Sequence, residues 1–189
     1  MNLYSVMIFV HVVSAFGIFA VLCLEAVALL HLRGAASVHE ARGWADFMSG
    51  LPAWTAASFL FLLFSGIFLI AEGVGWATPW PKVALGALLL IGPLGAASGR
   101  RMRAIRKACS AEIPNEFDLW GKLRDPLLKF SMNIRIAVVL GIVLLMTAKP
   151  DLLESLAIVA ASAVLGAAST FLFWRREAAS PMARAEFRE

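Results

Sequence analysis

Three ionisable side chains lie well away from the ends of the apolar stretches of this sequence, where an ionised group is costly. His11 and Glu25 fall within the first stretch, and Arg135 falls within a later one. An ionised side chain at the centre of a bilayer costs about 2.5–3.5 kcal/mol even on mild insertion scales, so such groups usually face a cavity, an opposite charge or a cofactor. Imidazole, carboxylate and guanidinium groups there can bind an anion, transfer protons or ligate a metal.

The helical period separates the first two of these groups by depth. Glu25 follows His11 by fourteen residues, which places both within about 40° of one helical face but about 21 Å apart along the helix axis. They can share an interface but cannot touch. Glu25 falls near the depth of Arg135 in the fourth span, and we expect these two to form a buried charge pair. Such a pair could hold the helices together, bind an anion or transfer protons.

A second polar group is expected where the second and third apolar runs meet. Glu72 ends one run and Lys82 lies at the start of the next, joined by a short loop rich in Gly, Pro and Trp. Because this loop holds two helix ends together, we predict an outward-facing polar pocket formed by His11, Glu72 and Lys82. The alternative is that Lys82 and the tryptophans only anchor the helices at the membrane interface.

The elements that must position these groups are five apolar runs, each long enough to cross a bilayer as a helix. Of the 189 residues, 60% are hydrophobic and 16% are charged, whereas soluble domains are about 25% charged. We therefore expect an all-α, polytopic membrane bundle of five transmembrane helices that forms one domain, residues 1–176. A disordered tail is expected over 177–189. The predicted spans are about 4–32, 52–71, 80–98, 127–148 and 152–174.

Lysine and arginine are distributed unequally between the two ends of these spans. Most of the 17 lie in the first loop, the third loop and the tail, whereas Lys82 and Lys149 lie on the other side. The positive-inside rule places the N-terminus outside and the C-terminus in the cytoplasm of a bacterial inner membrane. Since orientation explains the net charge of +4, no nucleic-acid partner is expected.

The third loop has a helical pattern of its own. Apolar residues recur there at spacings of three or four, among basic and acidic ones, at Ile113, Phe117, Trp120, Leu123 and Leu127. This pattern predicts a short helix at the membrane surface whose basic residues contact anionic lipid headgroups. A solvated loop with incidental apolar residues is the alternative.

Small residues predict close helix packing in two spans. Gly92, Gly95 and Gly99 recur in the third span, and a broad face of the fifth span carries Ala, Ser, Gly and Thr. These faces could pack within the protomer, or against a homo-oligomer or a membrane-protein partner. Pro93 should also kink the third span.

Two segments resemble a known superfamily. The run HVVSAFG from His11 and the run WPKVALGALLL from Trp80 are similar to segments of small bacterial inner-membrane proteins. This superfamily includes the HemJ-type protoporphyrinogen oxidases and the membrane part of copper-resistance protein D. The resemblance covers about the first hundred residues, and it implies haem b binding with His11 as an axial ligand to the iron and Lys82 as a functional residue. The histidine that HemJ-like proteins carry after the third-span leucine run is absent here. His31 could match the one that ends the first span.

Three functions remain open from the sequence. The first is a haem-binding or redox-linked membrane protein of the HemJ type. The second is a small transporter, permease subunit or ion-handling protein, with copper handling at Met7 and His11 as a branch. The third is a non-catalytic membrane subunit that binds a partner. No nucleophile–base set or phosphate-binding loop is visible in the sequence, so whether the chain is an enzyme stays open.

Overall fold

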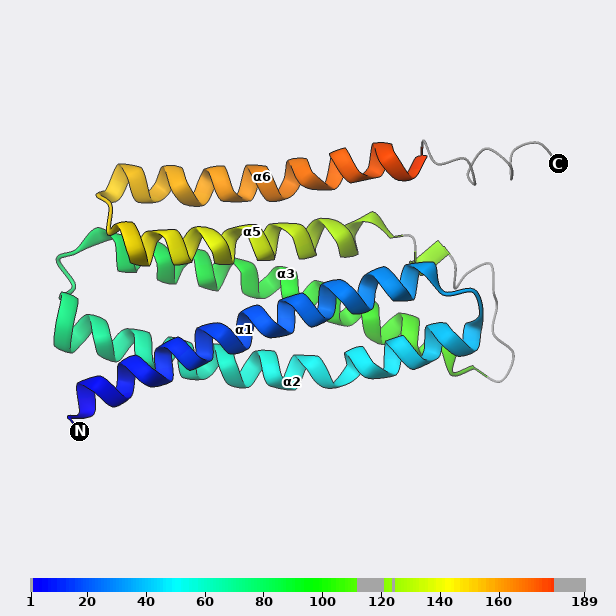
Figure 1. Cartoon of the computed structure of the whole chain (residues 1–189), viewed down its shortest axis with the longest axis horizontal. Coiled ribbons are helices and arrows are strands. Elements are labelled where there is room, and N and C mark those ends of the chain that lie inside the picture. The colour runs from blue at the N-terminus through cyan, green and yellow to red at the C-terminus, as the bar shows by residue number, and fades with distance from the viewer. Residues whose placement is uncertain (1, 112–120, 124, 179–189) are drawn as a thin grey trace.

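The computed structural model describes residues 2–111, 121–123 and 125–178, and over these it is helical without strands. Five long helices lie side by side along the long axis of the molecule, and the start of the first and the end of the last lie at opposite ends (Figure 1). They are α1 (Leu3–Gly34), α2 (Val38–Leu69), α3 (Pro79–Cys109), α5 (Pro126–Ala148) and α6 (Leu152–Ala178). A π-helical turn, η1 (Ile70–Val74), continues α2.

All five predicted spans correspond to helices that are long and apolar enough to cross a membrane. The first three, with η1 counted in α2, contain 31–37 residues, or about 46–56 Å of helix. A bilayer core is only about 30 Å thick, so these helices project beyond it or tilt within it. The outer surface of the bundle is apolar, with Phe16, Trp54, Leu90 and Leu153 each at least 70% exposed. Such a surface is typical of helices that face lipid.

The first loop is much shorter than predicted. The sequence predicts a connection over about 33–51, but α2 already begins at Val38. Ser37 Oγ accepts a hydrogen bond from the Glu40 amide at 3.2 Å, and Glu40 Oε2 accepts one from the Ala36 amide at 3.0 Å. This arrangement resembles a capping box, which starts a helix within a polar segment. Pro52, the predicted start of the second span, lies inside α2.

The third helix also extends past its predicted end at residue 98. It continues to Cys109 and carries a basic segment of Arg100, Arg101, Arg103, Arg106 and Lys107. Of the predicted interfacial helix, Ile113, Phe117 and Trp120 lie outside the described residues. Leu123 is buried, and its carbonyl accepts a hydrogen bond from Arg33 Nε at 3.1 Å. The predicted tail begins inside α6, and 179–189 lie outside the described residues.

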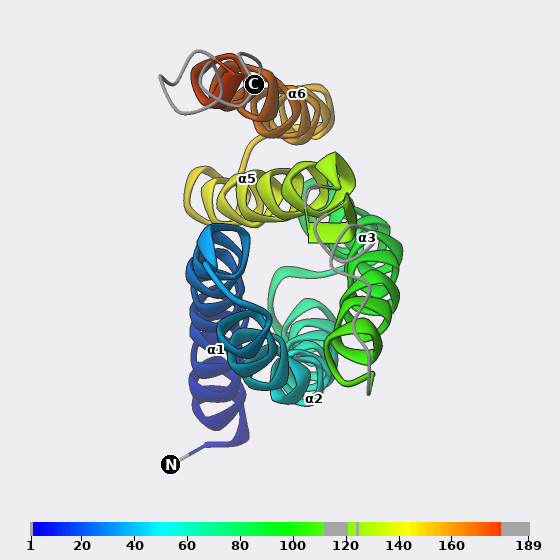
Figure 2. The same ribbon diagram turned by 90° about the vertical axis from the view of Figure 1, so that its right-hand side faces the viewer.

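Four helices surround a common axis, and α6 lies outside them. Viewed along the bundle, α1, α2, α3 and α5 form a ring, and α6 packs on the outer side of α5 (Figure 2). The ring holds two apolar cores. One contains Ile18, Leu22 and Leu88, and the other contains Leu29, Met102 and Leu128 near the basic end. The space between these two cores contains the candidate site.

Glycine allows close contact between α5 and α6. A Cβ atom on Gly166 would lie 2.8 Å from the carbonyl oxygen of Asn133 and 2.8 Å from the Cα of Ile134. Asn133 Nδ2 also donates a hydrogen bond to Thr170 Oγ1 at 3.1 Å. The small residues around Gly166 therefore serve packing within the protomer, one of the two roles that the sequence left open.

Candidate functional site

Arg135 and Glu25 form an ion pair that joins α5 to α1. Arg135 Nη2 donates a hydrogen bond to Glu25 Oε2 and lies 3.4 Å from Met132 Sδ. The two side chains are 8% and 14% exposed. The sequence predicted this pair from depth alone, and the structure brings its two members into contact.

Local sequence makes room for the guanidinium group. A Cβ atom on Gly95 of α3 would lie only 3.3 Å from Arg135 Nη1, so a larger residue there would crowd the side chain. Arg135 Nε is buried and has no hydrogen-bond partner among the described residues. A buried donor without an acceptor costs about 1–3 kcal/mol. Arg135 therefore keeps unused donor capacity beside its ion pair.

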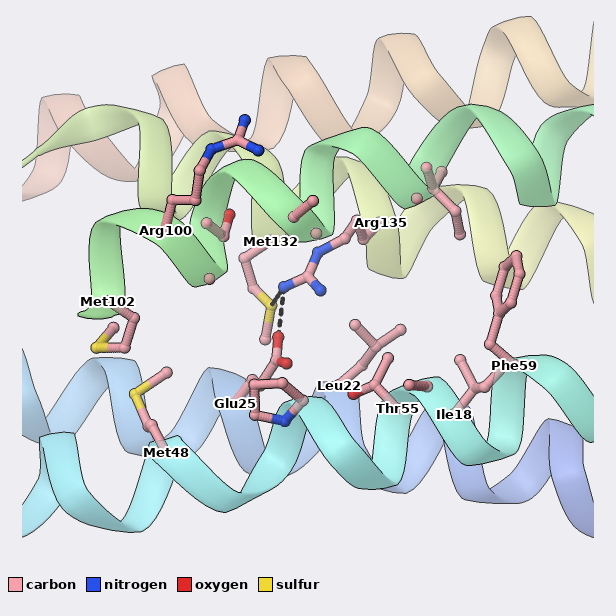
Figure 3. A pocket seen from close by; sticks show the side chains of 18 of the residues that line it. Ile18, Leu22, Glu25, Met48, Thr55, Phe59, Arg100, Met102, Met132 and Arg135 are labelled. Atoms are coloured by element: carbon pink, nitrogen blue, oxygen red, sulfur yellow. Dashed lines mark hydrogen bonds and ion pairs between the residues drawn. The ribbon is translucent and has the colours of Figure 1, made fainter. Parts of the chain in front are cut away.

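The pair lies in the wall of a cavity of about 430 Å³ enclosed by α1, α2, α3 and α5. This volume is within the 300–1,000 Å³ typical of small-molecule sites. Figure 3 shows Glu25 and Arg135 meeting midway along the cavity, with Phe59 and Ile18 toward one end and Arg100 and Met102 toward the other. The walls are mostly apolar and include Leu22, Met48, Ile91 and Met132.

A stripe of small residues forms the α3 wall of this cavity. Gly92, Gly95, Ala96 and Gly99 all line it. A Cβ atom on Gly92 would meet nothing within 4 Å, in contrast to Gly166 in α6. Gly92 therefore leaves space open rather than bringing two helices together, a role that the sequence alone does not predict.

A proline also interrupts the α2 wall. Pro52 lines the cavity from inside α2. It has no N–H group to donate to the carbonyl of Met48, one turn earlier, and Met48 lines the cavity as well. The helix is therefore weakened where it faces the ion pair.

The charge of the cavity lining is positive. Arg100, Arg103 and Arg135 line it, against the single carboxylate of Glu25, which leaves a formal excess of two positive charges. Arg100 and Arg103 form no ion pair with any residue that the structure describes, whereas the neighbouring Arg101 pairs with Asp125. The sequence predicts that these arginines orient the protein in the membrane and contact anionic lipid headgroups. The signal for a cavity is their recurrence with Gly92, Gly95 and Gly99 on one helical face.

His11 lies in a separate place, near the N-terminal end of the bundle. Its Nδ1 is 3.2 Å from Ser65 Oγ, and that hydroxyl lies 2.6 Å from the carbonyl oxygen of Phe61. Because the single hydroxyl proton goes to Phe61, Ser65 accepts a hydrogen bond from the protonated Nδ1 of His11. When the imidazole is neutral, Nε2 is then its acceptor atom.

The predicted pocket of His11, Glu72 and Lys82 does not form. His11 lines an apolar cavity of about 220 Å³ with Tyr4, Leu62 and Trp80, but Glu72 and Lys82 are exposed and do not line it. Glu72 lies in η1, whose π-helical turn changes the helical register after α2. Lys82 follows Pro81, which is the buried residue at this point of α3.

The residues around His11 do not fit an enclosed haem. A cavity of about 220 Å³ is smaller than pockets for drug-sized ligands, and haem is larger than most such ligands. His31 is twenty residues further along α1, about 30 Å away, and it stacks on Trp44 with ring centroids 4.5 Å apart. Among the described residues, no group of three or more His, Cys, Asp or Glu side chains could hold a metal ion.

The fold and the cavity define a class, a multi-pass helical membrane protein with a charged internal cavity. No protein-family model, no curated protein and no solved structure matches the chain. The functional assignment therefore rests on the geometry of this chain.

Proposed function

We propose that this protein is a small membrane transporter or permease subunit, and that the cavity at Glu25 and Arg135 is its substrate site. The observation that carries the proposal is that a buried ion pair lines an open cavity instead of a packed core. Ionisable groups at mid-membrane depth beside interrupted helices are typical of transporter sites. Pro52 and Pro93 each remove one backbone hydrogen bond from α2 and α3, two neighbouring helices that line the cavity.

The pair can act as a ligand-sensitive contact between two helices. An anion that reaches Arg135 competes with Glu25 for the guanidinium group, and it loosens the link between α1 and α5 when it succeeds. A ligand shifts a conformational equilibrium only through different contacts in the two states. The Glu25–Arg135 contact supplies such a difference, because it exists in one state and is replaced by a ligand contact in the other.

Charge movement in proteoliposomes tests this proposal. Vesicles adsorbed on a solid-supported membrane are exposed in turn to steps of chloride, acetate and octanoate, and the displaced charge is recorded. We expect a signal with at least one of these anions that is lost in Arg135→Gln and altered in Glu25→Gln. Lys82→Gln, which removes an exposed cation outside the cavity, should leave it unchanged. Absence of any signal that depends on Arg135 would favour a non-catalytic partner subunit instead.

The basic end of the bundle faces the cytoplasm in this proposal, and the N-terminus lies outside. Support comes from the positive-inside rule and from the basic segment at the end of α3, Arg100–Lys107. Anionic lipid headgroups would bind this segment at about 1 kcal/mol per basic residue near the surface. The proposed location is the bacterial inner membrane.

The resemblance to HemJ-like proteins has a direct spectroscopic test. Because the cavity at His11 is small and holds one imidazole, we expect the purified protein to show no Soret band, also after haem is added. An absorption spectrum recorded before and after reconstitution checks this. A Soret band in the wild-type protein that disappears in His11→Ala would instead restore the haem-binding function.

A further inference from the structure

The geometry points to an amphiphilic anion, an acidic headgroup attached to an acyl chain, as the ligand of the Glu25–Arg135 cavity. This inference rests on the proposed function, since it names the substrate class of the same site. It follows from three properties of the cavity, namely its charge, its walls and its unused hydrogen-bond donors.

The charge selects an anion. Arg100, Arg103 and Arg135 exceed the single carboxylate of Glu25, and the first two have no ion-pair partner among the described residues. Arg103 Nη1 would lie 3.8 Å from a Cβ on Gly99, so its guanidinium lies beside the small-residue stripe of the cavity wall. Planar guanidinium groups match carboxylate and phosphate oxygens well.

The walls select an acyl chain. Beyond Arg135, away from the basic end, the lining is apolar and includes Ile18, Leu22, Phe59, Leu88 and Ile91. A small hydrophilic anion would leave this half of the cavity without a partner. Met48, Met102 and Met132 also line the cavity, and methionine side chains adapt to flexible apolar ligands.

The buried guanidinium group gives an independent sign of a ligand. Arg135 is 8% exposed, lines the cavity, and has no acceptor for Nε among the described residues. Buried polar atoms without partners are rare in native proteins. An acidic headgroup that moved inward from Arg100 and Arg103 would reach this residue next, which gives the cavity a basic path from its rim to its centre.

Binding of radiolabelled laurate to the full chain in phosphatidylcholine nanodiscs tests the inference, by scintillation proximity. We expect laurate to bind, dodecanol to compete about tenfold more weakly, and acetate not to compete. The double variant Arg100→Gln/Arg103→Gln should weaken laurate binding about tenfold or more. Lys82→Gln, the control at the other end of the bundle, should stay within about twofold.

A pair of glycine variants on α3 tests the location. A leucine at Gly92 would occupy the cavity, and a leucine at Gly86 would not, because Gly86 does not line it; neither site has an atom within 4 Å of an added Cβ. We expect Gly92→Leu to abolish laurate binding and Gly86→Leu to retain it. Equal binding by both variants would overturn the inference, as would equal competition by dodecanol and laurate.

The lipid composition of the nanodisc shows whether the acidic amphiphile is a membrane phospholipid or a free carboxylate. If anionic phospholipid is the natural occupant, phosphatidylglycerol in the nanodisc will displace laurate in proportion to its content. If a free long-chain carboxylate is the occupant, phosphatidylglycerol will have little effect. Laurate binding without Arg135-dependent charge movement would support the inferred ligand class and contradict the proposed transport function. Charge movement without laurate binding would contradict the inferred ligand class and leave the proposed transport function supported.

Discussion

Replacing Glu25 with alanine is expected to destabilise the protein by about 3 kcal/mol. Removal of one member of a buried ion pair usually costs 3–5 kcal/mol, because the other charge remains buried without compensation. We expect the low end of that range, since the cavity beside Arg135 can admit water. Reversible denaturation of the purified protein in detergent micelles measures the loss.

Two controls separate loss of the pair from loss of a carboxylate. Glu72→Ala removes an exposed carboxylate and should change stability by less than about 0.5 kcal/mol. The double variant Glu25→Leu/Arg135→Met replaces both charges by apolar groups and should recover most of the stability. Equal effects of Glu25→Ala and Glu72→Ala would mean that the ion pair does not form in the folded protein.

Two glycine-to-alanine substitutions should have effects of opposite sign. Gly166→Ala should destabilise the protein by about 1–3 kcal/mol, because the new methyl group would lie 2.8 Å from backbone atoms of α5. Gly92→Ala should stabilise it by up to about 1 kcal/mol, because nothing lies within 4 Å of the new methyl group.

Thermal unfolding of the two variants, measured in the same detergent, checks this pair of expectations. The midpoint should fall for Gly166→Ala and rise or stay constant for Gly92→Ala. A drop of similar size in both would mean that α3 packs against another helix at Gly92, and that the cavity is closed in the folded protein.

The helices could be predicted from the sequence because length and hydropathy suffice to identify membrane spans. Their ends could not, since α2 begins at a capping arrangement of Ser37 and Glu40 within a polar segment that reads equally well as a loop. The Glu25–Arg135 pair could be predicted because helix rise and antiparallel order set the depth of each residue. It required no knowledge of which helix faces meet.

The parts of the site that depend on which helix faces meet were harder to predict from the sequence. The stripe of glycines in α3 has the same sequence signature as the close packing around Gly166, and only the neighbouring helices decide which of the two leaves a cavity. The predicted grouping of His11 with Glu72 and Lys82 was wrong because η1 changes the helical register before Glu72. The regular helical period does not reveal a π-helical turn.

The measurement that tests the cavity most directly compares cysteines at two adjacent positions in α2. Ala56 lines the cavity, whereas Ala57 is exposed on the bundle surface and does not line it. Ala56→Cys and Ala57→Cys are prepared without the native Cys23 and Cys109 and treated with a membrane-impermeant maleimide on each side of proteoliposomes. The residue at 56 should react from the side of the basic end of α3, and the residue at 57 should not react. Equal reactivity of the two, or no reaction at 56 from either side, would contradict a solvent-accessible cavity at Glu25 and Arg135.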